Sequence, residues 1–114
     1  MRIAIASTDG TKVDQHFGHA QRFYVYELVA GVATPAAIRP NEPSCGRQDG
    51  AAAHTRALDL ISDCDIVVVA NVGPCALGLI EARGMTCFET TDVVTRVLTA
   101  LAELEMPRVA EAQQ

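Results

Sequence analysis

The chain has 114 residues, of which 49% are apolar and 4% aromatic, and its formal net charge is −5. This length and apolar fraction predict one globular domain with a core of small aliphatic side chains. The acidic balance argues against a general nucleic-acid binder, and no apolar run reaches the roughly 20 residues that a membrane-spanning helix needs.

The periodicity of the apolar residues predicts five strands and three helices. In chain order, the predicted strands are residues 3–6, 22–28, 32–38, 65–70 and 85–88. The predicted helices are residues 51–62, residues 74–83 and a last helix that begins at Thr91 or Asp92 and that Pro107 ends. We therefore expect a single cofactor-binding domain at residues 1–106 and a frayed tail at residues 107–114.

The order of the elements is β-β-β-α-β-α-β-α. Right-handed crossovers would place helices on both faces of a mixed five-stranded sheet, which is an α/β fold. Pro35 predicts that the third strand lies at an edge of this sheet, because proline cannot donate to a strand ladder.

The start of the chain and the cysteines indicate a cellular compartment. After Met1 and Arg2, the apolar run is far too short for a secretory signal. The four cysteines are widely spaced and form no Cys-x-x-Cys pair, so in a reducing compartment they are expected to be thiols. We predict a cytoplasmic protein.

The strand directions predict which loops meet. If the carboxyl end of the first strand is called the upper edge, four segments should lie there: residues 8–21, 40–50, 71–75 and 89–92. These segments contain His16, His19, Cys45 and Cys75, and the first turn of the helix that follows residue 50 adds His54 at the same edge. The charged side chains assigned to this edge, Arg39 among them, sum to zero, and helix starts favour negative charge there. An anionic ligand would therefore meet no net repulsion at the upper edge.

The segment His16-Phe17-Gly18-His19 is the strongest candidate for a metal site. Its two imidazoles are three residues apart, so both can serve one centre, and imidazole is a ligand for Fe, Zn and Cu. Phe17 would anchor the loop, and Gly18 would let it close around a bulky ligand. The alternatives are a pair of polar loop residues or a histidine that caps a turn.

The other candidates each have a structural alternative. Cys45 lies in a loop with Gly and Pro, and is either a thiolate ligand or an incidental exposed thiol. Cys75 is either a thiolate favoured by a helix start or a small core residue. His54 shares a helix stripe with apolar residues, so we expect it to be partly buried and hydrogen-bonded. Cys64 and Cys87 are expected to pack as small hydrophobes.

Several stretches of the chain carry a resemblance to a known family: the opening IAIASTDG, the motif DQHFGHA followed by RF, and the later DCDIVV, VG and LIEARGM. They resemble the nitrogenase iron–molybdenum cofactor biosynthesis family, which includes NifX, the cofactor-binding domain of NafY and the carboxy-terminal domain of NifB. The resemblance implies a ribonuclease-H-like three-layer fold. It implies cluster binding by His16, and it adds His19, which some branches share, and Cys45, in the loop before the first helix.

Together these observations predict a non-enzymatic carrier in nitrogen fixation. It would transiently bind an iron–sulfur cluster or an iron–molybdenum cofactor precursor through His16, His19 and Cys45. Its partners would be nitrogenase or metallocluster assembly proteins, with no nucleic acid and no membrane. The alternative is a regulatory or protein-interaction module of the same fold without a bound cluster. A third hypothesis, an enzyme with Cys75 as nucleophile, lacks an assured base.

Overall fold

The computed structural model describes residues 1–41 and 50–112. Its strands are β1 (Arg2–Ala6), β2 (Arg22–Val29), β3 (Val32–Pro40), β4 (Ile66–Val69) and β5 (Thr86–Glu89). Its helices are the 3-10 turn η1 (Phe17–His19), α1 (Gly50–Leu60), α2 (Pro74–Ala82) and α3 (Val94–Ala112). Among the described residues, no helix has the length and apolar character needed to cross a membrane.

The five strands form one mixed sheet in the order β3-β2-β1-β4-β5. β1, β4 and β5 are parallel, whereas β2 is antiparallel to both β1 and β3. The predicted α/β fold is confirmed, and so is the edge position of the strand that contains Pro35. Because the three parallel strands end at the same edge, the loops that follow them meet there.

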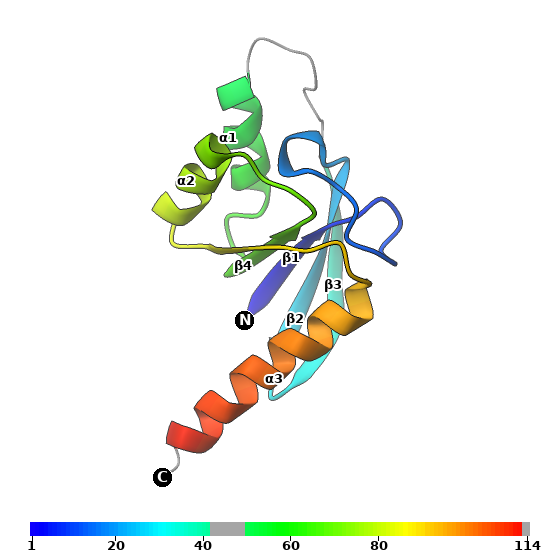
Figure 1. Ribbon diagram of the computed structural model, residues 1–114, viewed down its shortest axis with the longest axis vertical. Coiled ribbons are helices and arrows are strands. Elements are labelled where there is room, and N and C mark those ends of the chain that lie inside the picture. The colour runs from blue at the N-terminus through cyan, green and yellow to red at the C-terminus, as the bar shows by residue number, and fades with distance from the viewer. Residues whose placement is uncertain (42–49, 113–114) are drawn as a thin grey trace.

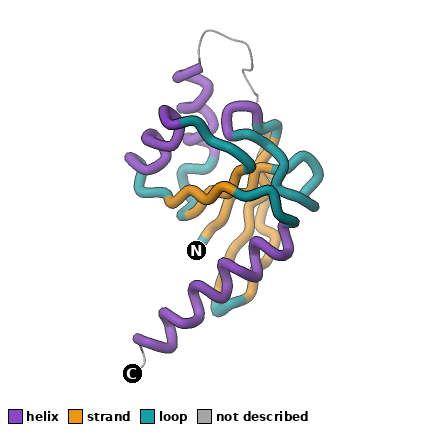
Figure 2. The backbone as a smooth tube through the Cα atoms, viewed as in Figure 1, coloured by secondary structure: helices purple, strands orange, loops and turns teal. Residues whose placement is uncertain are grey.

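Alternation along the strands divides the core into two layers. In β1, Ala4 and Ala6 belong to the core beneath α1 and α2, and Ile3 and Ile5 belong to the core beneath α3. The small alanines let the helices on their side approach the sheet closely. The result is a three-layer arrangement, with α1 and α2 together on one face and α3 on the other (Figures 1 and 2).

The last helix departs from its prediction. α3 continues through Pro107 to Ala112, so the expectation that Pro107 ends the helix is wrong. A proline removes one backbone hydrogen bond and bends a helix, but neither effect requires the helix to stop. The far end of α3 extends past the strands (Figure 1). The domain boundary at residue 106 stays a prediction.

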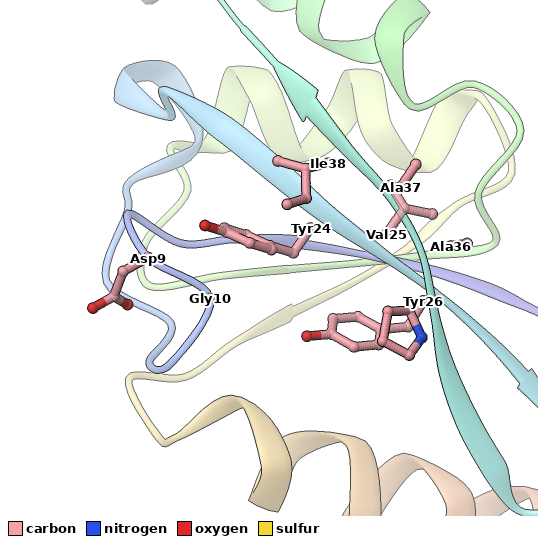
Figure 3. Close-up of a pocket in the computed structure, with 9 residues that line it drawn as sticks. Asp9, Gly10, Tyr24, Val25, Tyr26, Ala36, Ala37 and Ile38 are labelled. Carbon is pink, nitrogen blue, oxygen red and sulfur yellow. The ribbon is translucent and has the colours of Figure 1, made fainter.

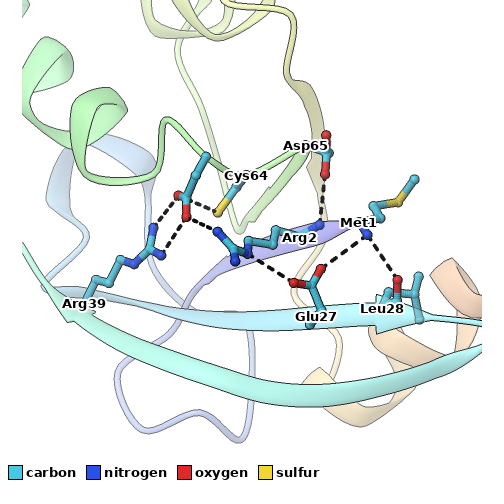
Figure 4. A network of polar contacts seen from close by, with 8 residues as sticks. Met1, Arg2, Glu27, Leu28, Arg39, Cys64 and Asp65 are labelled. Carbon is cyan, nitrogen blue, oxygen red and sulfur yellow. Dashed lines mark hydrogen bonds and ion pairs between the residues drawn. The ribbon is translucent and has the colours of Figure 1, made fainter.

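A network of ion pairs occupies the lower end of the sheet, opposite the ends of the parallel strands (Figure 4). Asp63 accepts hydrogen bonds from Arg39 and from Arg2, and Arg2 also pairs with Glu27. The amino group of Met1 donates to the Leu28 carbonyl at 3.2 Å. Hydrogen bonds from Arg39, and then those from Arg2, hold the pKa of Asp63 well below its usual value.

This network corrects the predicted charge of the upper edge. Arg39 was assigned there because β3 ends upward, but its guanidinium also donates to the Leu60 carbonyl at 3.0 Å and is committed to Asp63. A long side chain can reach a partner well away from its own backbone. The upper edge therefore has one cation fewer than the strand directions predicted.

Candidate functional site

The loop between β1 and β2 is joined to the sheet by backbone hydrogen bonds. The Phe17 N–H donates to the Asn71 carbonyl at 2.9 Å, and the Ala70 N–H donates to the Gln15 carbonyl at 3.0 Å. His16 and Asn71 thus form a parallel bridge just beyond the end of β4. The histidine loop is a short continuation of the sheet, which fixes the position of its backbone.

Phe17 anchors this loop in the core. Its side chain is 1% exposed, and its ring centroid lies 6.1 Å from that of Phe23 and 5.8 Å from that of His54. An apolar side chain buried to this extent favours one orientation of η1 over others. The two histidines on either side of Phe17 and Gly18 are therefore presented from a fixed turn.

His16 caps that turn with its own ring. Its Nδ1 accepts the Gly18 N–H at 3.0 Å, and its backbone is extended, as expected for an N-cap residue. Burial, and then the charges of His19 and His54, lower the pKa of His16, while Glu89 opposes them. The ring is half-buried, and Nδ1 carries no proton while it accepts this hydrogen bond, as a metal-binding imidazole nitrogen requires.

His19 forms the outer part of the site. Its ring centroid lies 5.1 Å from that of His16, with the ring planes tilted by 47°. The side chain of His19 is exposed to solvent, whereas that of His16 is half-buried. The structure thus brings the two predicted histidines together, as their spacing indicated, on a surface that a large ligand can reach.

His54 approaches the same turn from α1. A methyl group built on Gly18 would lie 3.4 Å from His16 Nδ1 and 3.4 Å from His54 Nε2, so both nitrogens face the same small volume. His54 is half-buried, as expected, but its buried Nδ1 has no hydrogen-bond partner within residues 1–41 and 50–112. For this nitrogen, the predicted hydrogen bonding is wrong. The residue's position at the upper edge was the available signal for a role in the site.

The segment after β4 forms the neighbouring wall. The Glu89 carboxylate accepts the Val72 N–H at 2.9 Å and holds this segment beside β5. At Gly73, no side chain caps the start of α2. Cys75, in the first turn of α2, is exposed and free, and no hydrogen bond or ring contact among the described residues joins it to the histidines.

The other cysteines divide into two groups. Cys64 is buried and Cys87 half-buried, and burial raises the pKa of each thiol to about 11. Both pack against the core beneath α1 and α2, which confirms the expectation for them. Cys45 lies outside the described residues. Among the described residues, no three His, Cys, Asp or Glu side chains are placed to hold a single metal ion.

A hollow that the sequence did not predict lies on another face. Tyr24, Tyr26 and Ile38 line a space of about 500 Å³ beside Asp9 and Gly10 (Figure 3). Gly10 has a φ of +81°, and a Cβ there would lie 2.8 Å from the Tyr24 ring, so the turn requires glycine. No histidine lines this hollow. The site described above is therefore separate from it.

Comparisons with known proteins agree with this architecture. A family model described as dinitrogenase iron-molybdenum cofactor matches residues 1–106. The FeMo cofactor biosynthesis protein NifB of Klebsiella pneumoniae is 34% identical over 90 residues, which cover 73% of this chain and 19% of NifB. Protein NifY of Azotobacter vinelandii is 27% identical over 98% of this chain and 48% of NifY. The chain thus spans about a fifth of the first relative and about half of the second.

A solved structure shows the same fold. The apo form of the orange protein from Desulfovibrio gigas superposes with a TM-score of 0.66 and 24% sequence identity, covering 88% of this chain and 86% of that protein. At this identity the likeness concerns the arrangement of strands and helices. It supports the ribonuclease-H-like fold that the sequence motifs implied.

Proposed function

Since the chain belongs to the dinitrogenase iron–molybdenum cofactor family, we propose that it is a carrier without catalytic activity. Its cargo is an iron–sulfur cluster or a precursor of the iron–molybdenum cofactor. Its partners are nitrogenase or metallocluster assembly proteins. The relatives that are named for cofactor biosynthesis are larger than this chain, so the proposal concerns the one domain that they share with it.

The proposal rests on one observation. The ring centroids of His16 and His19 lie 5.1 Å apart, on a turn whose backbone is hydrogen-bonded to the sheet. Imidazole is a good ligand for iron, and the Nδ1 of His16 accepts a hydrogen bond and so carries no proton. His19 is exposed, so a cargo larger than a single ion can be reached from solvent. His16 is the principal ligand in this proposal, and His19 and Cys45 assist it.

The residues around Gly18 fit such a group. The glycine leaves a space that a methyl group would fill, between nitrogens of His16 and His54. The start of α2 is uncapped by any side chain, and its N–H groups favour a negatively charged cargo. The first feature provides room for a ligand, and the second favours an anionic one.

The cap formed by His16 supports release as well as binding. Its Nδ1 accepts the Gly18 N–H, so a metal atom competes with that N–H for the same lone pair. When the cargo departs, the Gly18 N–H donates to His16 Nδ1 again. Such competition weakens binding, which suits a protein that must pass its cargo on.

The test is cluster loading without oxygen. Wild type, His16→Ala, His19→Ala and Cys45→Ala are offered a synthetic [4Fe–4S] cluster or an isolated cofactor precursor. Bound iron and sulfide, absorption and EPR are then measured. We expect His16→Ala to lose at least about tenfold in retained iron and the other two variants to lose less. Cys75→Ser, which changes an exposed thiol at the same edge, is the matched control and should load like wild type.

Two outcomes would contradict the proposal. Equal retention by wild type and His16→Ala would remove His16 as principal ligand. If wild type retains no cluster, a protein-interaction module of the same fold becomes the better description.

A further inference from the structure

His54 has one ring nitrogen that finds no hydrogen-bond partner in the part of the chain that the structure describes. Its Nδ1 is buried, and within the described part of the chain nothing donates to it or accepts from it. The ring lies beside Phe17, with centroids 5.8 Å apart, so its surroundings on that side are apolar. A buried polar atom without a hydrogen bond is uncommon and calls for a physical reason.

The unpartnered nitrogen indicates where the ring holds its proton. A neutral imidazole has one N–H and one bare nitrogen. A buried N–H without an acceptor is rarer, and more costly, than an acceptor that lacks a donor. In a neutral His54 ring, this favours the tautomer with the proton on Nε2 and Nδ1 as the bare nitrogen.

The Nε2–H faces the histidine turn. Nε2 would lie 3.4 Å from a methyl group on Gly18, at the same distance as His16 Nδ1. His16 Nδ1 already accepts the Gly18 N–H, so it is not free to accept from His54. No hydrogen bond from His54 Nε2 is formed by the described residues. A donor is thus directed at the space where the cargo would sit.

We infer that His54 is a positioning residue that donates its Nε2–H to a sulfide of the cargo. This inference rests on the proposed function and assigns a residue to the same site. His16 provides the metal ligand, and His54 provides a hydrogen bond from the opposite wall, across the gap that Gly18 keeps open. The acceptor is an anionic inorganic sulfide, which cannot donate and so matches a site that presents a donor.

A hydrogen bond to a cluster sulfide has a measurable consequence. The reduced cluster carries more negative charge than the oxidised one, so the donor stabilises the reduced form more strongly. Removing the donor should therefore lower the reduction potential, because hydrogen bonds to the sulfurs are among the determinants of that potential. Loss of packing alone would not shift the potential in this way.

The experiment compares two substitutions in the complete chain. His54→Gln keeps an N–H donor at a similar reach, and His54→Leu keeps the bulk but removes the donor. Each is loaded with a synthetic [4Fe–4S] cluster, and its retained iron, reduction potential and nitrogen hyperfine couplings are measured. We expect His54→Leu to retain several-fold less iron and to show a lower potential, whereas His54→Gln stays close to wild type.

A second measurement needs no cargo. Nitrogen-15 NMR of the empty protein reports which nitrogen of His54 is protonated, and we expect Nε2–H. As a further variant, Gly18→Ala places a methyl group in the gap and should lower iron retention, while circular dichroism shows whether it stays folded.

Each contrary outcome has its own meaning. If His54→Leu matches wild type in iron and potential, or if NMR finds Nδ1–H, the inference is overturned while His16 ligation stands. If His54→Gln loses a nitrogen coupling together with iron, His54 is a ligand and not a donor, which also overturns the inference. If wild type binds no cluster, the proposed function itself fails, and the inference fails with it.

Discussion

The polar side chains at the two ends of the sheet differ in whether they pair with one another. At the lower end, Arg2, Glu27, Asp63 and Arg39 pair with one another, and the amino terminus joins them. At the upper end, three histidines lie together, and only His16 has a hydrogen bond from the protein to a ring nitrogen among the described residues.

This difference indicates that the polar groups at the lower end contribute to stability and those at the upper end to binding. Polar groups that satisfy each other lower the free energy of the folded state without needing a ligand. Groups left unsatisfied contribute little or even destabilise, and such positions are frequent at functional sites. Apolar substitutions of Asp63 at the lower end and of His54 at the upper end should therefore change the free energy of unfolding in different directions.

The largest expected effect is a loss of stability from a substitution at the upper end of the sheet. Phe17→Ala removes the one aromatic side chain that holds the histidine turn in the core, and it should lower the free energy of unfolding by about 3 kcal/mol. Urea unfolding measures this. His19→Ala is the control, because the side chain is exposed and should change stability little. A loss below about 1 kcal/mol in Phe17→Ala would mean that the backbone bridge to Asn71 suffices.

A smaller loss of stability is expected from a substitution at the lower end of the sheet. Asp63→Asn should cost about 1 kcal/mol at pH 7, because the carboxylate is partly exposed and solvent screens its ion pairs. The folded pKa of Asp63 lies below its ordinary value of 3.8, so this stabilisation is present above that value and is lost as the pH falls below it. Urea unfolding at pH 7 and at pH 3 should show the difference between variant and wild type shrinking at the lower pH. A difference that stays constant with pH would argue against the ion pairs as its cause.

The smallest expected effect is an increase, and not a decrease, in the free energy of unfolding. His54→Leu replaces a ring that has an unpartnered buried nitrogen, and it should raise the free energy of unfolding by about 0.5 kcal/mol. Thermal and urea unfolding of the empty protein, with Asp63→Asn measured in parallel, test this contrast. A clear loss of stability in His54→Leu would show that the ring has a stabilising contact.

The sequence predicted the topology well because periodicity and strand direction are local properties. Short apolar runs identified β1 and β4, Pro35 identified the edge strand, and the direction of each strand brought His16 and His54 to one end. What it did not predict depends on where side chains reach in three dimensions. The contact of Arg39 with Asp63 and the buried Nδ1 of His54, which has no partner among the described residues, are revealed by no spacing in the chain. The cap of His16 on Gly18, in contrast, joins residues two apart and is the local alternative that the sequence left open.

The bridge between His16 and Asn71 has a consequence for binding entropy. Ordering the backbone of one residue costs roughly 1–2 kcal/mol, and a flexible loop would meet this cost each time a ligand arrived. Here the continuation of the sheet orders the loop when the chain folds. A ligand at this turn then encounters a rigid surface, and only the release of the Gly18 N–H remains to be compensated by its contacts.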